Sequence, residues 1–443
     1  MKQSWTPESL CRSVLTVAAV SLLPAVMWAD GGISNIPPAV IVSASIEHSL
    51  AIRASDQDIE AAAAREKQTF ALGLPSVNFE GRAGRYDGLK DIVFAQGVVI
   101  PAVENHFSAS ISLLQPVFTG GLVPNQRQSA GYQRKAAGLL RDNARADAIF
   151  YALSAYWIWS KAFYAVAVLD ASAARTKAHA DDVHNMQQAG LITDNEVLAT
   201  DVLVDRTRLQ LEQARRNVDL ARARVEFLAG RELPAGSTPE RAGSPSDETI
   251  PIAAELMQQA RRRPEYTARN MEVMSAESLA RAAQSGFYPQ VYLAAKYEQA
   301  NPNMLYIPPA DEWHGDAFAG ISIAWNLLDW GLARGRADEA AARAVQARLR
   351  LQQLDEQTVL EIREAMVLLQ DAFGRVALTG KALVSANRNL VVTTDLWQSG
   401  VARHSEVLDA HAKLTEAQYE ETVARSDVAL ARAALDHATG KGE

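Results

Sequence analysis

Histidine is the residue type in this chain best suited to acid–base or metal chemistry near neutral pH, and eight histidines occur among 443 residues. Only two pairs are close in sequence, His179 with His184 and His404 with His411. Their spacings of five and seven residues do not match the HExxH metal motif, and the single cysteine excludes a CxxC site. We therefore expect solvated histidines on helix surfaces, with no bound metal and no cofactor.

No catalytic constellation is visible elsewhere in the sequence. It contains no nucleophile elbow, phosphate-binding loop or dinucleotide-binding glycine pattern, so no catalytic residue is predicted and an enzyme is the least favoured function. The net charge is −8 and no basic run is present, which disfavours a nucleic-acid partner. If the protein moves a substrate, the energy must come from a partner.

Two segments built on one template indicate an internal duplication. They run over residues 186–198 and 396–408, and each contains a glycine followed six residues later by Glu-Val-Leu. Gly190 and Gly400 lie 210 positions apart, and other matches keep the same offset over roughly 120 positions. Each half of the chain is therefore predicted to build the same unit.

The first 29 residues have the pattern of a secretory signal. A basic start precedes an apolar core from Val14 to Val26, and Ala29 supplies a small residue for cleavage. The core is about 13 residues long, shorter than the ~20 needed to span a bilayer. Cys11 precedes this core, so we expect an unlipidated mature protein without cysteine.

Each half is predicted to contain a helix, two strands and a long helical hairpin. The strands alternate apolar and polar residues with period two, which indicates one apolar and one polar face. Thr193 and Glu196 form a capping box that predicts where a second hairpin arm begins. The predicted order is a signal peptide (1–29), a first repeat (30–230, with a helix at 46–70, strands at 74–86 and 106–118, and a hairpin at 125–229), a linker (231–251) and a second repeat (252–443, with a helix at 252–285, strands at 288–299 and 317–327, and a hairpin at 332–438).

These elements predict an oligomeric tube. Four two-faced strands cannot close a barrel, and open sheet edges are not stable within a bilayer. Three chains would supply about twelve strands, enough for a channel. Hairpin arms of about 95 Å need similar neighbours to bury their apolar stripes. We expect a β end in an outer-membrane-type bilayer and an α end outside it.

The order of several motifs resembles the TolC-like outer-membrane efflux protein family over nearly the whole mature chain. Each motif is loose by itself, so the resemblance depends on their order and on the duplication. The matching motifs are Leu74-Pro75-Ser76-Val77 before a strand, Gln115-Pro116-Val117-Phe118-Thr119-Gly120-Gly121 after a strand, Arg262-Arg263-Pro264-Glu265 at the start of the second half, Ala283 to Val291, and the two glycine turns ending in Glu-Val-Leu.

This resemblance implies a fold and partners. The fold class is an internally duplicated α+β membrane protein, in which two strand pairs contribute to a trimeric twelve-stranded outer-membrane β-barrel and long helical hairpins form a periplasmic α-barrel. The partners are two further copies of the chain, outer-membrane lipid, a periplasmic adaptor (membrane fusion) protein and an inner-membrane pump. The exported substrates would be drugs, metals or proteins.

The resemblance also implies a gate beyond the second glycine turn. The family carries two acidic positions there, three residues apart, which correspond to Glu406 and Asp409. Residues at i and i+3 share a helix face, so a trimer would present six carboxylates to one lumen and favour cations. The alternative is that these acids only stabilise a helix start through the macrodipole. Ala199 occupies the position of the second acid in the first repeat.

Two further sets of residues follow from the resemblance. Trp397 matches an aromatic residue that braces the closed mouth in the family, whereas the family's basic position falls on Ala402, next to Arg403. The turns at Gly190-Leu191 and Gly400-Val401 resemble the tips on which adaptors dock. Their alternative is a plain helix-hairpin loop in which glycine supplies a positive φ.

The favoured function is the exit duct of a tripartite efflux or type I secretion system. A periplasmic coiled-coil scaffold or adaptor without a membrane pore is the alternative. Such a scaffold shares the long hairpins but does not need four two-faced strands. The sequence does not identify the substrate, the pump or the resting state of the channel.

Overall fold

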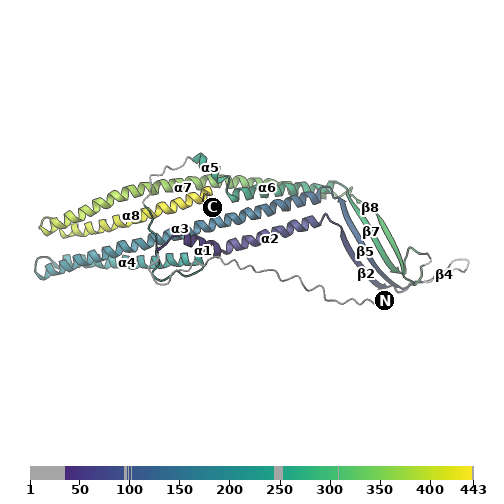
Figure 1. The fold of residues 1–443 in the computed structure, drawn as a ribbon, viewed down its shortest axis with the longest axis horizontal. Helices are drawn as coiled ribbons and strands as arrows, with labels where there is room; N and C mark the ends of the chain where they lie inside the picture. Colours follow the sequence, from purple (N-terminus) through teal and green to yellow (C-terminus); the bar gives the residue numbers. More distant parts are fainter. Residues whose placement is uncertain are drawn as a thin grey trace, which may run out of the picture.

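The computed structural model describes residues 35–93, 97, 99–100, 102–243, 253–307 and 309–441. The predicted signal at 1–29 lies outside these residues, as does the end of the predicted linker. The molecule is elongated, with a bundle of helices at one end and a four-stranded sheet at the other (Figure 1). The two helical hairpins turn at the end farthest from the sheet.

Eight α-helices are present in the described part of the chain, four in each repeat. The two longest, α3 and α7, contain 67 residues each, which corresponds to about 100 Å. The returning helices α4 and α8 contain 36 residues each, so they cover about half of that length. The bounds are Pro38–His48 (α1), Leu50–Ala71 (α2), Leu122–Gln188 (α3), Asp194–Ala229 (α4), Ala253–Ala260 (α5), Pro264–Ala283 (α6), Leu332–Gln398 (α7) and His404–Thr439 (α8).

Where the sequence predicted one helix at 46–70 and one at 252–285, each repeat contains two helices, and α1 begins eight residues before the first predicted helix. Between α1 and α2 the break falls at Ser49, whose hydroxyl accepts a hydrogen bond from the backbone N–H of Ile52. Between α5 and α6 it precedes Pro264, which lacks an N–H and is favoured at the first position of a helix. The prediction of a single helix was wrong at both places because these local signals interrupt the periodic pattern.

Four strands form one antiparallel sheet in the order β2-β5-β7-β8. The first strand pair of the chain therefore lies beside the second, and β2 and β8 form the two outer edges. The bounds are Ser76–Arg85 (β2), Asn105–Phe118 (β5), Gln290–Asn301 (β7) and His314–Ala324 (β8). Two short strand pairs are separate from this sheet: β1 (Asn35–Ile36) with β6 (Thr238–Pro239), which packs against α3, and β3 (Ile92–Val93) with β4 (Val99–Ile100).

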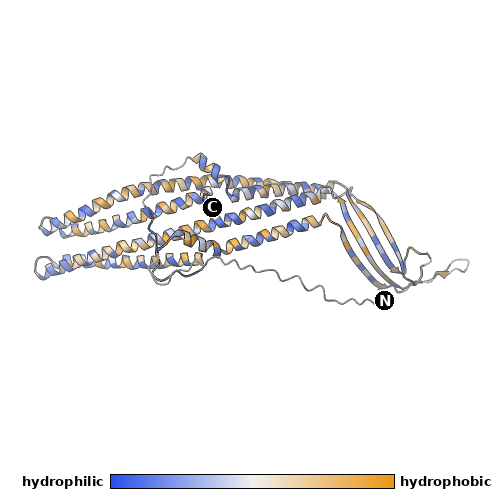
Figure 2. Cartoon of the chain, in the orientation of Figure 1, coloured by the Kyte–Doolittle hydropathy of each residue, from blue (hydrophilic) through white to orange (hydrophobic). Residues whose placement is uncertain are grey.

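The register of the sheet separates an apolar face from a polar face, because directly paired residues lie on the same face. Phe79 pairs with Ile111 and Ile111 pairs with Tyr297 on one face, where all three side chains are at least partly exposed in the single chain. Ser110 and Glu298 pair on the other. Figure 2 shows hydrophobic and hydrophilic residues following one another along these strands.

Aromatic residues of the strands fall on both faces of the sheet. Phe79 and Tyr297 lie on the apolar face. Phe318 pairs with Lys296 and therefore lies on the polar face. In outer-membrane barrels, girdles of aromatic residues face the lipid, so only the strand aromatics on the apolar face can belong to one.

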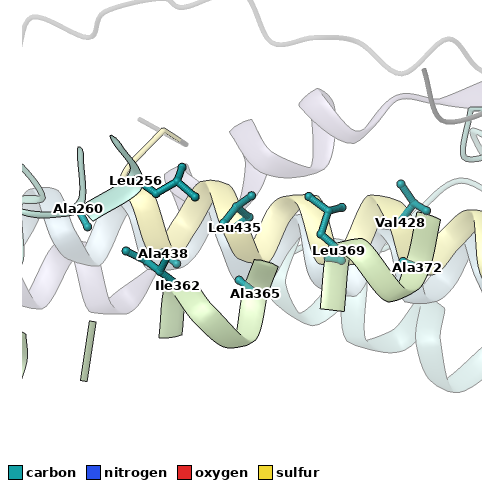
Figure 3. Packing of buried hydrophobic residues seen from close by; sticks show 10 residues of the cluster. Leu256, Ala260, Ile362, Ala365, Leu369, Ala372, Val428, Leu435 and Ala438 are labelled. Atoms are coloured by element: carbon teal, nitrogen blue, oxygen red, sulfur yellow. The ribbon is translucent and has the colours of Figure 1, made fainter. Parts of the chain in front are cut away.

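The helices pack around separate apolar cores in the two hairpins. Tyr156 and Trp159 of α3 are buried against α1 and α4, and the Tyr156 hydroxyl donates to the carbonyl of Ile36 at 2.7 Å. The second core contains Leu256 of α5 with Leu369 of α7 and neighbouring residues of α8 (Figure 3). Among the described helices only α3 is long and apolar enough to cross a membrane. In the part of α3 richest in aromatic residues, Tyr156 and Trp159 are buried within the bundle, whereas Tyr151 is 58% exposed.

Candidate functional site

The two hairpin tips have the same backbone geometry. Gly190 and Gly400 have φ values of 75° and 79°, and no atom lies within 4 Å of an added Cβ at either position. The N–H of each glycine donates to the carbonyl three residues earlier, and the following N–H donates to the carbonyl five residues earlier. This Schellman pattern satisfies the last carbonyls of α3 and α7. The predicted glycine turns are therefore present in both repeats.

Each tip exposes one large apolar side chain directly after its glycine. Leu191 is 73% exposed and Val401 is 75% exposed, so neither side chain packs against its own hairpin. A Schellman turn frequently buries this side chain against the preceding helix, and these two turns do not. The tips therefore present apolar surface at the end of the molecule, where contact with another protein would bury it.

At the first tip, the acidic residue in the first turn of the returning helix is used in capping. The side chain of Glu196 accepts hydrogen bonds from the backbone N–H of Thr193 at 2.9 Å and from the Thr193 hydroxyl at 3.2 Å. Thr193 and Glu196 thus form the predicted capping box of α4. The Glu196 carboxylate is fixed beside the helix start rather than free to face outward.

At the second tip, the equivalent acidic residue is not used in capping. Arg403 occupies the N-cap position of α8 and its side chain makes no capping hydrogen bond. Glu406 and Asp409 are both exposed, and neither makes a hydrogen bond or ion pair with the described residues of this chain. Val407 and Ala410, buried at 0% and 1% exposure, hold the opposite side of the same turns against the bundle. The two carboxylates therefore point away from their own bundle.

The structure does not bring Trp397 and Arg403 together. Trp397 packs across the molecule against His179, with the ring centroids 5.3 Å apart, and against His404 at 5.4 Å. The side chain of Arg403 is exposed, and within the described residues it has no hydrogen-bond or ion-pair partner. Any bracing of the mouth by Arg403 must involve a group outside the described residues of this chain.

Three histidines and Trp397 form a cluster between the two hairpins, which we call the histidine cluster. His179 of α3 lies against His404 and His411 of α8, with ring centroids 5.1 and 5.2 Å apart. His179 and His404 are 7% and 5% exposed. The expectation that these histidines are solvated was wrong. Sequence spacing gave no signal for the cluster, because its central pair is separated by 225 residues.

Burial lowers the pKa of all three histidines, so the neutral rings are favoured. The pKa of His179 falls from 6.5 to about 4, first through burial and then through repulsion from His411 and His404. Burial also lowers the pKa of His404, while Glu196 acts in the opposite direction. Burial, then Arg175 and His404, lower the pKa of His411.

Several polar side-chain pairs cross the interface between the hairpins, whereas the core within each hairpin is apolar. We call this α3–α8 interface the seam. Side chains of α3 pair with side chains of α8 at intervals from the middle of the bundle to the tips. The pairs are Asp147 with His437 (2.8 Å), Lys161 with Asp427 (2.8 Å), Ser172 with Thr415 (2.6 Å) and Arg175 with Gln418 (2.9 Å), followed by the histidine cluster.

No metal site is evident in the described part of the chain, where no group of three or more His, Cys, Asp or Glu residues is arranged to hold an ion. The near-parallel rings of His179 and His404, 17° apart, explain this for the histidine cluster. Ring nitrogen lone pairs lie in the ring plane, so stacked imidazoles do not converge on one point. The geometry of the cluster favours ring packing over coordination.

The family of the chain is shown by a sequence match to both repeats. A model described as outer membrane efflux protein matches residues 41–231 and 256–441. The chain therefore belongs to the outer membrane efflux protein family, as the motifs suggested. The chain has no significant match among curated proteins.

Solved structures show that the fold is shared over nearly the whole chain. CusC, from a study of folding and transmembrane channel formation, is 17% identical, with a TM-score of 0.80 and coverage of 94% of this chain and 95% of CusC. The outer membrane protein VceC of Vibrio cholerae is 18% identical, with a TM-score of 0.78 and coverage of 91% and 96%. The open state of the MtrE outer membrane channel of Neisseria gonorrhoeae is 17% identical, with a TM-score of 0.73 and coverage of 91% and 88%.

These findings confirm the predicted fold class and location. The protein is an internally duplicated α+β membrane protein, with two strand pairs for the β-barrel of the family's trimeric channels and long helical hairpins for the periplasmic α-barrel. It is an outer-membrane efflux channel protein of a Gram-negative-type envelope and extends into the periplasm. The family is one of channels rather than enzymes, and a scaffold without a pore is set aside.

Proposed function

We propose that this chain forms a homotrimeric exit duct, through which an inner-membrane pump and a periplasmic adaptor export substrates across the outer membrane. The observation that carries the proposal is the two-faced sheet at the end of the long hairpins. Its apolar face is exposed in the single chain, and β2 and β8 present open edges. Lipid on that face and neighbouring copies at both edges would satisfy the sheet.

The hairpin tips are proposed as the adaptor-docking surface. Gly190 and Gly400 make the tight turns, and Leu191 and Val401 supply the exposed apolar contacts. Both tips lie at the end of the molecule opposite the sheet, which is the periplasmic end in this family (Figure 1). A partner that covers the two side chains would bury most of their surface and gain hydrophobic stabilisation.

Glu406 and Asp409 are proposed as the lumen gate. The geometry supports a ring over a plain helix start, because both carboxylates are exposed on one face and free of partners among the described residues. Threefold repetition would collect six negative charges around the axis and favour cations over anions. A wider pore at this ring would be needed for larger cargo.

Bracing of the closed mouth is proposed for Trp397 and Arg403 in different ways. Trp397 links the end of α7 to α3 through His179 and so holds the two hairpins of one chain together. Arg403 is exposed and has no partner in the described part of its own chain, so its guanidinium is proposed to pair with a group of a neighbouring protomer. The bracing interactions thus divide into one within a chain and one between chains.

Deletion of the gene tests the duct and its cargo together. The mutant is exposed to a panel of dyes, detergents, antibiotics and metal salts, and the secreted proteins of the same cultures are profiled. Broad sensitisation with an unchanged secretome assigns small-molecule efflux, and a missing secreted protein with normal sensitivity assigns protein secretion. Normal results in both assays, with no second channel gene in the strain, would contradict the proposal.

Tip variants in the complemented strain test adaptor docking. Leu191→Glu with Val401→Glu places charge on the apolar tips and is expected to abolish complementation at wild-type trimer abundance, because a buried unpaired carboxylate is costly. Leu191→Ile with Val401→Leu keeps the apolar surface and is the matched control. Full complementation by the charged variant would show that the tips do not dock a partner.

A further inference from the structure

The histidine cluster lies close to the two hairpin tips. It joins α3 of the first hairpin to the end of α7 and the start of α8 of the second, at the tip end of the polar seam. The same turns of α8 carry Glu406 and Asp409. A movement of the start of α8 away from α3 would separate His404 and His411 from His179.

We propose that His179, His404 and His411 form a proton-operated latch, which holds the two hairpin tips of one chain together when the rings are neutral and releases them when the periplasm becomes acidic. The consequence for transport rests on the proposed gate, since release would free the turns that carry Glu406 and Asp409. The latch itself is a property of the seam within one chain.

The hydrogen bonds of His404 favour the neutral form of its ring. The Thr200 hydroxyl lies 2.8 Å from the carbonyl of Glu196 and 2.8 Å from Nε2 of His404. One hydroxyl proton cannot serve both, so with the hydroxyl donating to the carbonyl, Nε2 of His404 carries the proton and donates to Thr200. Nδ1 of His404 is then an unprotonated acceptor, buried and without a partner. A proton added there would find no acceptor in the packed arrangement.

His179 meets the same constraint from the other hairpin. Its Nε2 is buried without a hydrogen-bond partner, and its ring is enclosed by His404, His411 and Trp397. A charge on His179 would therefore be desolvated and would lie next to two further titratable rings. Moving α8 away from α3 would expose these rings to water, which stabilises their protonated forms.

The charged groups around the cluster oppose its protonation, except for Glu196. On α3, Arg175 adds a positive charge close to His411. On α4, Glu196 is the one anion that acts on His404. The end of α7 contributes the uncharged Trp397, and α8 contributes His404 and His411 themselves. His404 is the first residue of α8, where the helix dipole disfavours a cation. If two or three of these histidines were protonated, their positive charge would exceed the single negative charge of Glu196.

The direction of the pH effect follows from the lowered pKa values. The packed arrangement is fully stabilised above the ordinary histidine pKa of 6.5, and this stabilisation is lost as the pH falls toward the packed value, about 4 for His179. With a pKa of 6.5 when the tips are separated and about 4 when they are packed, protonation of His179 alone favours the separated arrangement by about tenfold at about pH 5.5. His404 and His411 act in the same direction because burial lowers their pKa values too.

Hydrogen exchange of the purified trimer tests the latch without any transport assay. Exchange of residues 404–411 is compared at about pH 7.5 and about pH 5.5 after correction for the chemical exchange rate. We expect protection to fall about tenfold or more at the acidic pH. The triple variant carries His179→Phe, His404→Gln and His411→Phe. Phenylalanine keeps an aromatic ring at positions 179 and 411, glutamine keeps a donor to Thr200 at position 404, and none of the three new side chains titrates. Protection should then be the same at both pH values.

Two controls separate the latch from general acid effects. His184→Gln changes a histidine five residues further along α3, half-exposed and 3.7 Å from Asp201 of α4, and should keep the acid response. Ser172→Cys with Thr415→Cys places a disulfide across the seam, where the native oxygens are 2.6 Å apart. The oxidised form should lose the response and the reduced form should regain it.

Each outcome decides the proposal. An equal loss of protection in wild type and triple variant, or no loss in wild type, overturns the latch. The exit-duct proposal would survive that result, because hydrogen exchange does not measure transport. A trimer whose protection responds to acid, in a strain where deletion of the gene changes neither drug sensitivity nor the secretome, would overturn the exit-duct proposal and leave the latch standing.

Discussion

The two hairpin tips share one backbone and differ in what their side chains contact. In the first tip, Gln187 donates a hydrogen bond to exposed Asp194 at 2.8 Å. The same two positions in the second tip hold Trp397 and His404, whose rings contact each other and pack against α3. The first tip is thus closed on itself, whereas the second is tied to the opposite hairpin.

The same contrast applies to the acids after each turn. Thr193 and Glu196 satisfy each other in the first tip, while Arg403 in the N-cap position leaves Glu406 without a capping role. A single position, threonine in one repeat and arginine in the other, decides whether the glutamate serves its own helix or is free for the lumen. The duplication therefore supplies two equal hairpins, and a few side chains make one of them the proposed gate.

The largest expected effect comes from removing the charges that distinguish the second tip. Glu406→Gln with Asp409→Asn should reduce the preference for cations over anions by about tenfold, because a change of only ~1.4 kcal/mol in the potential at the ring has that effect. Reversal potentials of the purified trimer in planar bilayers measure it. Glu196→Gln is the matched control and should leave selectivity unchanged. Equal selectivity in all three proteins would mean that the acids only start a helix.

A smaller effect is expected from transferring the first tip's capping residue to the second. Arg403→Thr would place a threonine three residues before Glu406 and complete a capping box. We expect the start of α8 to be stabilised by about 1 kcal/mol, seen as roughly fivefold slower hydrogen exchange at residues 404–408. Cation preference should fall by less than in the double variant, since Glu406 is drawn toward its helix. Arg403→Lys, which cannot cap, is the control, and slower exchange there would refute the capping explanation.

The smallest expected effects are on the stability of the tips, and they distinguish the roles of Glu196 and Glu406. Glu196→Ala should destabilise the first tip by about 1 kcal/mol because it removes two hydrogen bonds of the capping box. Glu406→Ala should cost only about 0.3 kcal/mol, the contribution of a carboxylate near a helix N-terminus. Hydrogen exchange at each tip measures both changes. Equal costs at the two tips would show that Glu406 has a capping role after all.

Features that depend on near neighbours in sequence were predicted well. The alternation in the strands indicated a two-faced sheet, the two glycine turns were recognised from their repeated template, and Thr193 with Glu196 indicated the start of α4. Each of these depends on φ, on a hydrogen bond across one helical turn, or on the period of a pleated strand. The breaks at Ser49 and Pro264 were missed because the apolar pattern continues across them.

The contacts between hairpins were decided only by the tertiary structure. Lys161 and Asp427, or His179 and His404, are more than 200 residues apart, and no local pattern marks them as partners. Whether a helical histidine faces water or a second helix depends on how two long helices are rotated about their axes when they pack. The sequence by itself determined the hairpins, the turns and the duplication. The fold then placed the titratable groups of α3 and α8 in one buried cluster, because packing joins residues that sequence distance separates.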